Sequence, residues 1–175
     1  EVAPRLLQRR LDNAVDLRLA VSERRLNVLV HEPRPSWNAA FVRRSLEQDS
    51  SFEVSTIVQA SRGLAVRAGT PPAALTAARL SPFDVVLIGA PEELRQSEIE
   101  ALLTFARIRG GAVVFLPDRR PAGRYLELIP SAKFDDVLVD SAIAIQSIAG
   151  APLRASEIAV FRASLPGASV LASIE

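Results

Sequence analysis

The stretch Leu26–Asp49, LNVLVHEPRPSWNAAFVRRSLEQD, decides the fold class. Its first residues, 26–31, form a short apolar run rich in β-branched side chains, which is typical of a strand covered on both faces. Pro33 and Pro35 end this run and favour an extended loop. Ser36 can then cap a helix, because its hydroxyl can accept a hydrogen bond from a free helical N–H. The stretch therefore predicts a buried strand, a short loop and a helix.

The spacing of apolar residues in this helix predicts which of its faces is buried. Trp37, Ala40 and Phe41 recur at helical spacing, with Val42 and Leu46 beside them, and we expect this face to pack on the sheet. Trp37, the sole tryptophan, would then cover the first strand as part of the core. The alternative is that Trp37 forms a surface platform for a sugar or a partner chain.

Further strands are expected after this helix. The interpretation places buried or half-buried strands at 52–58, 84–89 and 112–116, and a loop at 59–70. The C-terminal third is less regular. There, strands are expected at 137–139, 158–161 and 170–174, and the run 143–148 is ambiguous.

Helices are expected between these strands. The first begins at Pro71, is capped by Thr70 and ends before Pro82. The second begins at a capping box, Ser97–Glu100, and ends at Gly110-Gly111. Its expected buried face consists of Ile99, Leu102, Leu103 and Ala106. A short third helix is expected within 121–129.

Alternating strands and helices with short loops imply right-handed crossovers and a parallel sheet. We therefore expect a three-layer, flavodoxin-like α/β fold, with helices on both faces of the sheet. Residues 1–22 contain an alternating run at 15–21, which we interpret as a linker or the last strand of a preceding β-domain. The α/β domain is expected to span 23–175. Whether 15–21 pairs with its sheet is left open.

Composition excludes several classes of site and function. A net charge of +1 argues against a dedicated nucleic-acid binder. The absence of cysteine excludes disulfides, thiolate metal sites and a cysteine nucleophile. No apolar run approaches the ~20 residues that span a bilayer, and the N-terminus lacks the order of a signal peptide. The chain contains no methionine, so we interpret it as part of a longer protein whose anchors lie outside it.

Ligands of open parallel sheets bind outside the carboxyl ends of the strands. Four loops of this chain are expected there, and they hold His31, Glu32 and Arg34; Gln59, Ser61 and Arg62; Ala90, Glu92 and Glu93; and Asp118, Arg119 and Arg120. Arginine and carboxylate together suit recognition of an anion or a carbohydrate. The alternative is that these are ordinary solvated loop charges.

His31 is the only histidine, so any Ser-His-Asp site must use it, with Asp118 and a serine such as Ser61. No Gly-x-Ser-x-Gly elbow is present to expose that serine. A metal site would have to combine His31 with carboxylates alone. We interpret His31 instead as a strand-end histidine that hydrogen-bonds a neighbour. No catalytic residue, metal or cofactor is expected.

Three segments resemble a known family. VLVHEPRPSWNAAFVRRSLEQDSSFEV (28–54) resembles the opening of glutamine amidotransferase-like domains of large bacterial membrane proteins, which often accompany von Willebrand factor A modules. The matching residues are Pro35, Trp37, Arg43, Arg44, Leu46 and Asp49, and Asn38 replaces the usual acid. Residues 83–118 resemble the third strand, the helix and the Gly-Gly strand of that family. Residues 168–172 resemble one of its late strands.

The family's catalytic residues are missing. Its enzymes carry a cysteine on a tight turn after a strand, and the nearest candidate here, after Leu116 and Pro117, continues with Asp118. No histidine follows. The resemblance thus implies an amidotransferase-like scaffold without the enzyme. It also implies a membrane-anchored parent, an extracytoplasmic (periplasmic) location and a domain interrupted at 175 before its last strand. A cytoplasmic location stays open.

The sequence and the resemblance together favour a non-catalytic interaction or scaffold domain of a larger envelope protein. We expect a protein partner, and membrane contact only through segments outside this chain. The alternatives are a sugar or carboxylate binding module that uses the strand-end crevice, and a hydrolase. The residues expected to bind a ligand or partner are His31, Glu32, Arg34, Trp37, Asp118 and Arg119.

Overall fold

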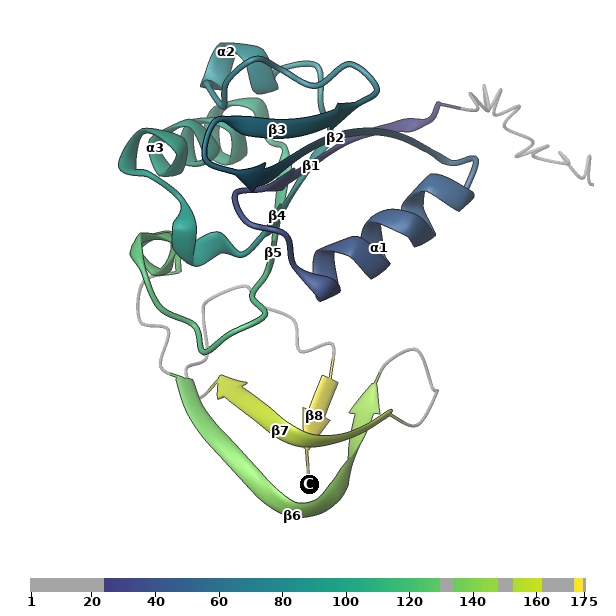
Figure 1. Cartoon of the computed structure of the whole chain (residues 1–175), viewed down its shortest axis with the longest axis vertical. Helices are drawn as coiled ribbons and strands as arrows, with labels where there is room; N and C mark the ends of the chain where they lie inside the picture. The colour runs from purple at the N-terminus through teal and green to yellow at the C-terminus, as the bar shows by residue number, and fades with distance from the viewer. Residues whose placement is uncertain (1–23, 130–133, 148–152, 162–171, 175) are drawn as a thin grey trace, which may run out of the picture.

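The computed structural model describes residues 24–129, 134–147, 153–161 and 172–174 (Figure 1). Its main sheet has five strands: β1 (Leu26–Glu32), β2 (Phe52–Ser61), β3 (Leu64–Ala68), β4 (Val85–Gly89) and β5 (Ala112–Leu116). Their order is β3-β2-β1-β4-β5. The strands β2, β1, β4 and β5 run parallel, and β3 pairs antiparallel with β2. The fold is therefore α/β with a mostly parallel sheet, consistent with the expected flavodoxin-like arrangement.

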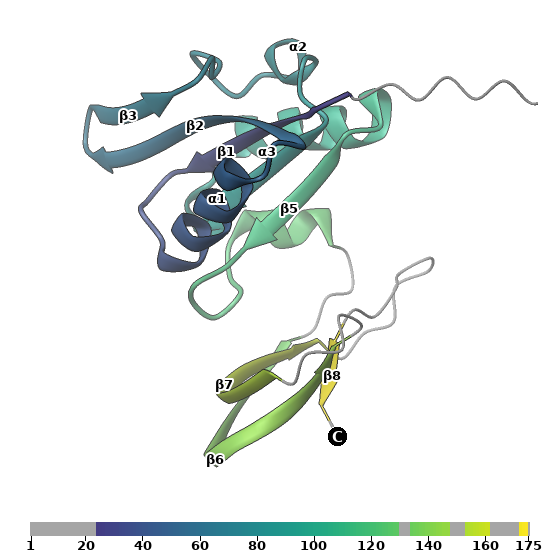
Figure 2. The same ribbon diagram turned by 90° about the vertical axis from the view of Figure 1, so that its right-hand side faces the viewer.

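Helices pack against both faces of this sheet (Figures 1 and 2). They are α1 (Trp37–Gln48), α2 (Ala77–Leu80) and α3 (Gln96–Thr104), with a π-helical turn η2 (Phe105–Arg109) and 3-10 turns η1 (Pro91–Glu93) and η3 (Arg124–Leu128). One apolar cluster joins Val28, Val30 and Leu87 to Ala39 of α1. The other joins Leu29, Val86 and Ile88 to α2, α3 and η3. Alternate strand residues thus reach opposite helices, as the pleat requires.

The expected strand and helix at the start of the domain are confirmed. The backbone N–H of Ala39 donates to the hydroxyl of Ser36 at 3.1 Å, which makes Ser36 the N-cap of α1. The first turn of α1 lies close against the end of β4. A Cβ added at Gly89 would lie 2.6 Å from the Cβ of Ala39, so only glycine allows this approach.

The expected buried face of α1 is wrong for Trp37 and Phe41, but Val42 and Leu46 do pack against the core. Trp37 is 75% exposed and Phe41 59%, whereas Ala39 is fully buried. Two stripes of α1 have helical spacing, one beginning at Trp37 and one beginning at Ala39 and continuing through Val42 and Leu46. Periodicity alone cannot choose between them. The small Ala39 faces the sheet because α1 must approach Gly89 closely, and the aromatic stripe consequently faces outward.

Two further expectations between 59 and 81 are wrong. The expected loop contains a hairpin, in which β2 runs on to Ser61 and β3 follows a turn with a positive φ of 78° at Gly63. The expected helix from Pro71 is reduced to the four residues of α2, with Thr76 as its N-cap. Because Pro72 follows it directly, Pro71 disfavours a helical conformation, and the helix therefore begins later in the chain.

The second expected helix begins one residue before its proposed capping box. The carboxylate that caps it belongs to Glu98, which accepts a hydrogen bond from the backbone N–H of Arg95 at 2.9 Å. Phe105 is buried and Ala106 exposed, contrary to expectation, because the π-helical turn changes the spacing there. Gly110 ends the turn with a φ of 72°, as expected for a helix stop.

The C-terminal strands form a separate sheet. The strands β6 (Phe134–Ser147), β7 (Leu153–Phe161) and β8 (Ala172–Ile174) are antiparallel in the order β7-β6-β8. The run 143–148, ambiguous in the sequence, is strand as far as Ser147. The alternating run at 15–21 and most of 168–172 lie outside the described residues.

Candidate functional site

Three loops after parallel strands meet at the carboxyl edge of the sheet, and Arg34 joins them. Its guanidinium donates two hydrogen bonds to Asp118, at 2.7 and 3.1 Å, and one to Glu92 at 2.6 Å. These partners follow β5 and β4, whereas Arg34 follows β1. Each side chain is about a quarter exposed or less. We call Arg34, Glu92 and Asp118 the strand-end brace.

The strand-end brace occupies both terminal nitrogens of Arg34, and the Nε is buried, with no partner in the described residues. A guanidinium that forms a two-bond fork with one carboxylate and contacts a second has little capacity left for an outside anion. The hydrogen bonds that Arg34 donates to Asp118 and Glu92 raise the pKa of Arg34. The hydrogen bond from Arg34 outweighs partial burial and lowers the pKa of Asp118. This geometry therefore suits holding three loops in place.

Glu32 supports the start of α1. It is 2% exposed, and its Oε2 accepts a hydrogen bond from the backbone N–H of Ser36 at 3.1 Å. The Nε of Arg43, near the middle of α1, lies 3.7 Å from Oε1. A carboxylate at this end of a helix also interacts favourably with the helix dipole. Glu32 thus connects the end of β1 to the helix that follows.

His31 is buried on the opposite face of the sheet. Its Nε2 lies 4.0 Å from Oε1 of Glu98, and its Nδ1 has no hydrogen-bond partner in the part of the chain that the structure describes. Burial lowers the pKa of His31 to about 4; the nearby Glu98 acts against this shift and Arg95 adds to it. His31 is therefore neutral at pH 7. The expected hydrogen bond from His31 to a neighbour is not formed with Glu98, because 4.0 Å exceeds hydrogen-bond distance.

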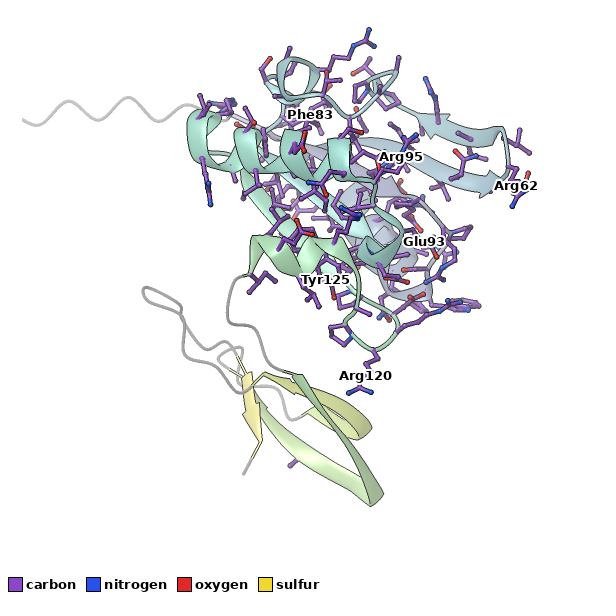
Figure 3. All side chains as sticks on the ribbon, turned by 90° about the vertical axis from the view of Figure 1, so that its left-hand side faces the viewer. Arg62, Phe83, Glu93, Arg95, Arg120 and Tyr125 are labelled. Atoms are coloured by element: carbon purple, nitrogen blue, oxygen red, sulfur yellow. The ribbon has the colours of Figure 1, made fainter. Side chains whose placement is uncertain are left out.

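Glu98 is held by Arg95, which Figure 3 labels at the start of α3. Burial acts to raise the pKa of Glu98, but the side-chain and backbone hydrogen bonds from Arg95 outweigh it and the pKa is lowered. The carboxylate beside His31 is thus Glu98. Asp118, the candidate for a Ser-His-Asp arrangement, is hydrogen-bonded to Arg34 instead.

Two features at this edge of the sheet were not expected from the sequence: the backbone conformation of Ala90 and the burial of Tyr125. Ala90 has a left-handed backbone, with φ 48° and ψ 56°, between β4 and η1. Its side chain is a methyl group, so this strained turn presents no nucleophile. Tyr125, labelled in Figure 3, packs on Phe115 with ring centroids 5.2 Å apart. Burial, with a smaller effect of Glu92, raises the pKa of Tyr125 to about 12.

The outer surface of α1 carries an exposed aromatic pair. The rings of Trp37 and Phe41 are stacked, with centroids 6.0 Å apart and an interplanar angle of 30°. The guanidinium of Arg44 lies 6.0 Å from the centroid of Phe41. We call Trp37, Phe41 and Arg44 the aromatic face of α1. Arg119, the remaining expected contact residue, is exposed on the loop after β5.

Two pockets lie away from the expected strand-end crevice. One, of about 540 Å³, lies near the amino ends of β1 and β2, under the loop after β3, and is lined by Asn27, Glu53, Ser55, Thr70, Pro71, Pro72, Ala73, Arg79, Pro82 and Phe83. The other, of about 370 Å³, lies between α2 and α3. Neither is lined by His31, Arg34, Trp37 or Asp118.

Comparisons with known proteins add no further constraint. No family model, no curated protein and no solved structure matches the chain. Within the described ranges, no group of three or more His, Asp or Glu side chains could hold a metal ion. In the same part of the chain, no helix is both long and apolar enough to cross a membrane.

Proposed function

We propose that this α/β domain is a non-catalytic interaction domain that binds a protein partner through the aromatic face of α1. The observation that carries the proposal is the exposure of Trp37, at 75%, in a stacked pair with Phe41. Tryptophan and arginine are enriched among the residues that dominate binding energy at protein interfaces. A tryptophan left in water by the fold is therefore a strong candidate anchor.

The partner's chemistry follows from the three side chains. Two stacked rings present apolar area with few rotamers to restrict, which favours an aliphatic or aromatic side chain opposite them. Arg44 forms no ion pair in the part of the chain that the structure describes, so a carboxylate of the partner can pair with it. We infer a partner segment that combines an apolar anchor with a neighbouring acidic residue.

The strand-end brace supports this surface indirectly. Arg34 fixes the loop that leads into Trp37, and Glu32 fixes Ser36 directly before it. A surface held rigid before binding loses less conformational freedom when it binds. In this proposal Arg34 is a positioning residue, Trp37 contacts the partner, and the exposed Arg119 contributes at the rim.

The setting of the domain is also a proposal. The resemblance to amidotransferase-like domains favours a larger membrane-anchored bacterial envelope protein with this domain outside the cytoplasmic membrane. The missing cysteine and the absence of a histidine after β5 support a non-catalytic role within that resemblance.

A crosslinked pull-down from membranes of the source organism tests the proposal. The baits are the intact parent protein, the parent with Trp37→Ala and Phe41→Ala together, and the parent with Leu64→Ala and Val66→Ala on β3. The control pair is similarly exposed, at 60% and 58%, but lies at the far edge of the sheet. We expect a partner that is lost only with the α1 variant. A partner set unchanged by that variant contradicts the proposal.

A ligand-binding function is a second candidate, favoured by the pocket of about 540 Å³, which falls within the usual range for small-molecule sites. Its charged lining residues, Glu53 and Arg79, suit a ligand that carries both an amine and a carboxylate. Saturable thermal stabilisation by such a compound, abolished by Arg79→Ala, is the expected result. A flat response across a panel of amino acids and amino sugars removes this candidate.

A further inference from the structure

The two edges of the main sheet differ in how they are protected. The edge strand β3 carries the charged Arg67, and its pairing with β2 contains a bulge between Gln59 and Ser61. A charge and a bulge both discourage pairing with another strand. The β5 edge has neither. The run 110–117, GGAVVFLP, contains no charged residue, and β5 consists only of apolar side chains. No strand pairs with the outer side of β5 in the described part of the chain.

β5 also has the composition of a strand that is covered on both sides. Continuous apolar runs are typical of interior parallel strands, such as β4. Val113 and Phe115 pack in the cluster beneath α3. Val114 points to the other face, belongs to neither apolar cluster and is 40% exposed. The centre of an apolar edge strand is therefore left open to solvent.

The backbone pattern shows which groups are free on this edge. The N–H of Ala112 donates to the carbonyl of Asp84, toward β4. Because successive residues of a strand point their N–H and C=O groups to opposite sides, those of Val113 and Phe115 point away from β4. These groups need a strand or water as their partner.

We propose that β5 pairs antiparallel with β5 of a second copy of this chain, about a two-fold axis at Val114. In that register Val113 lies opposite Phe115 of the partner copy, and each pair exchanges two hydrogen bonds through the outward groups. Val114 lies opposite its own copy in the non-hydrogen-bonded position, where side chains are closest. The two sheets then form one sheet of twice five strands.

A second copy fits this edge better than an unrelated strand. An antiparallel pair of identical strands is self-complementary, which is the requirement of a two-fold interface. The uncharged run brings no like charges together at its centre and offers no charge to select a different partner. One strand pair buries less surface than a standard interface. We therefore expect a reversible dimer whose population rises with concentration.

Sedimentation of the full 175-residue chain across a range of concentrations gives the first readout. The mass is expected to rise from 18.9 kDa toward twice that value. Val114→Glu places two carboxylates against each other at the axis and should abolish the rise. Val114→Thr keeps a β-branched side chain and should retain it. A chain that stays monomeric at every concentration overturns the proposal.

The absence of cysteine allows a second, site-specific readout. Val114→Cys should form a disulfide between copies under mild oxidation, because Cα atoms in a non-hydrogen-bonded pair lie at about 4.5 Å, close to disulfide geometry. Val66→Cys on the β3 edge, which is also exposed, should crosslink far more slowly. Equal crosslinking at both positions, or a dimer that Val114→Cys does not crosslink, overturns the proposed interface.

Discussion

The guanidinium of Arg34 holds the carboxylate of Asp118 through two hydrogen bonds, although 84 residues separate them. The pair joins the loop between β1 and α1 to the loop after β5. In the sheet, β4 lies between β1 and β5. A contact of this kind positions the start of α1, and with it Trp37, relative to the whole sheet.

Arg34→Ala should destabilise the fold by about 1–3 kcal/mol, because Asp118 and Glu92 would remain partly buried without their charged donor. Urea denaturation at pH 7 measures this change. Arg119→Ala, which removes an exposed arginine from the loop after β5, is the control and should change stability by less than about 0.5 kcal/mol. Equal effects of the two variants would show that the strand-end brace contributes nothing.

Stability should fall as the pH falls from about 6.5 to about 4. The pKa of His31 is lowered from 6.5 to about 4 in the folded chain, so the unfolded chain binds more protons within this window. The contribution of His31 to stability is thus fully present above pH 6.5, its pKa in the unfolded chain. It is lost as the pH falls toward about 4, its pKa in the folded chain. A shift of this size corresponds to roughly 3–4 kcal/mol.

The matched variant for this prediction is His31→Gln, which keeps a polar side chain but cannot titrate. Denaturation midpoints at pH 7, 6, 5 and 4.5 should fall more steeply for the original chain than for the variant. The carboxylates whose pKa is also lowered, Asp49, Asp84, Glu98 and Asp118, are present in both chains, so the difference between the two profiles reports on His31 and its interaction with Glu98. Parallel pH profiles would contradict the neutral, buried state of His31.

Gly89→Ala should destabilise the fold by about 1–3 kcal/mol, since the added Cβ would lie 2.6 Å from the Cβ of Ala39 and 3.1 Å from the Cγ of Glu32. The backbone must shift to admit it. Adding Ala39→Gly to this variant removes one of the clashing groups and should recover part of the loss. Thermal denaturation distinguishes the outcomes, and a variant as stable as the original would refute the close approach of α1 to β4.

Ser36→Ala should cost about 1 kcal/mol, because it removes the hydroxyl that accepts from the N–H of Ala39. Thr76 offers a matched comparison: it is the N-cap of α2, but its side chain makes no capping hydrogen bond. Thr76→Ala should therefore have a smaller effect in the same denaturation assay. The reverse order of the two effects would contradict the capping geometry.

Local signals in the sequence predicted the strand–helix unit at 26–48 well. Pro33, Pro35 and Ser36 act through the backbone of their immediate neighbours, so their meaning does not depend on the rest of the fold. The parallel strands β4 and β5 were equally clear from their apolar runs. The hairpin at Gly63 was missed because its strands extend through polar residues without a strong alternation.

The contacts of the site depend on distant packing and could not be predicted. The sequence placed Arg34 and Asp118 at one edge of the sheet but could not show that they bond each other. It favoured burial of Trp37 because two stripes of α1 share helical spacing. Gly89, which is 50 residues away from Ala39 in the sequence, determines which stripe is buried, because it lets the alanine stripe approach β4.

The fluorescence of Trp37 tests the central claim most directly. Trp37 is the only tryptophan, so the difference between the chain and its Trp37→Phe variant isolates its emission even when the captured partner contains tryptophan. In the free chain, emission should be red-shifted and readily quenched by iodide. On titration with the partner it should shift to the blue and become protected. A signal that stays fully quenchable while the partner is bound would contradict an interface on the aromatic face of α1.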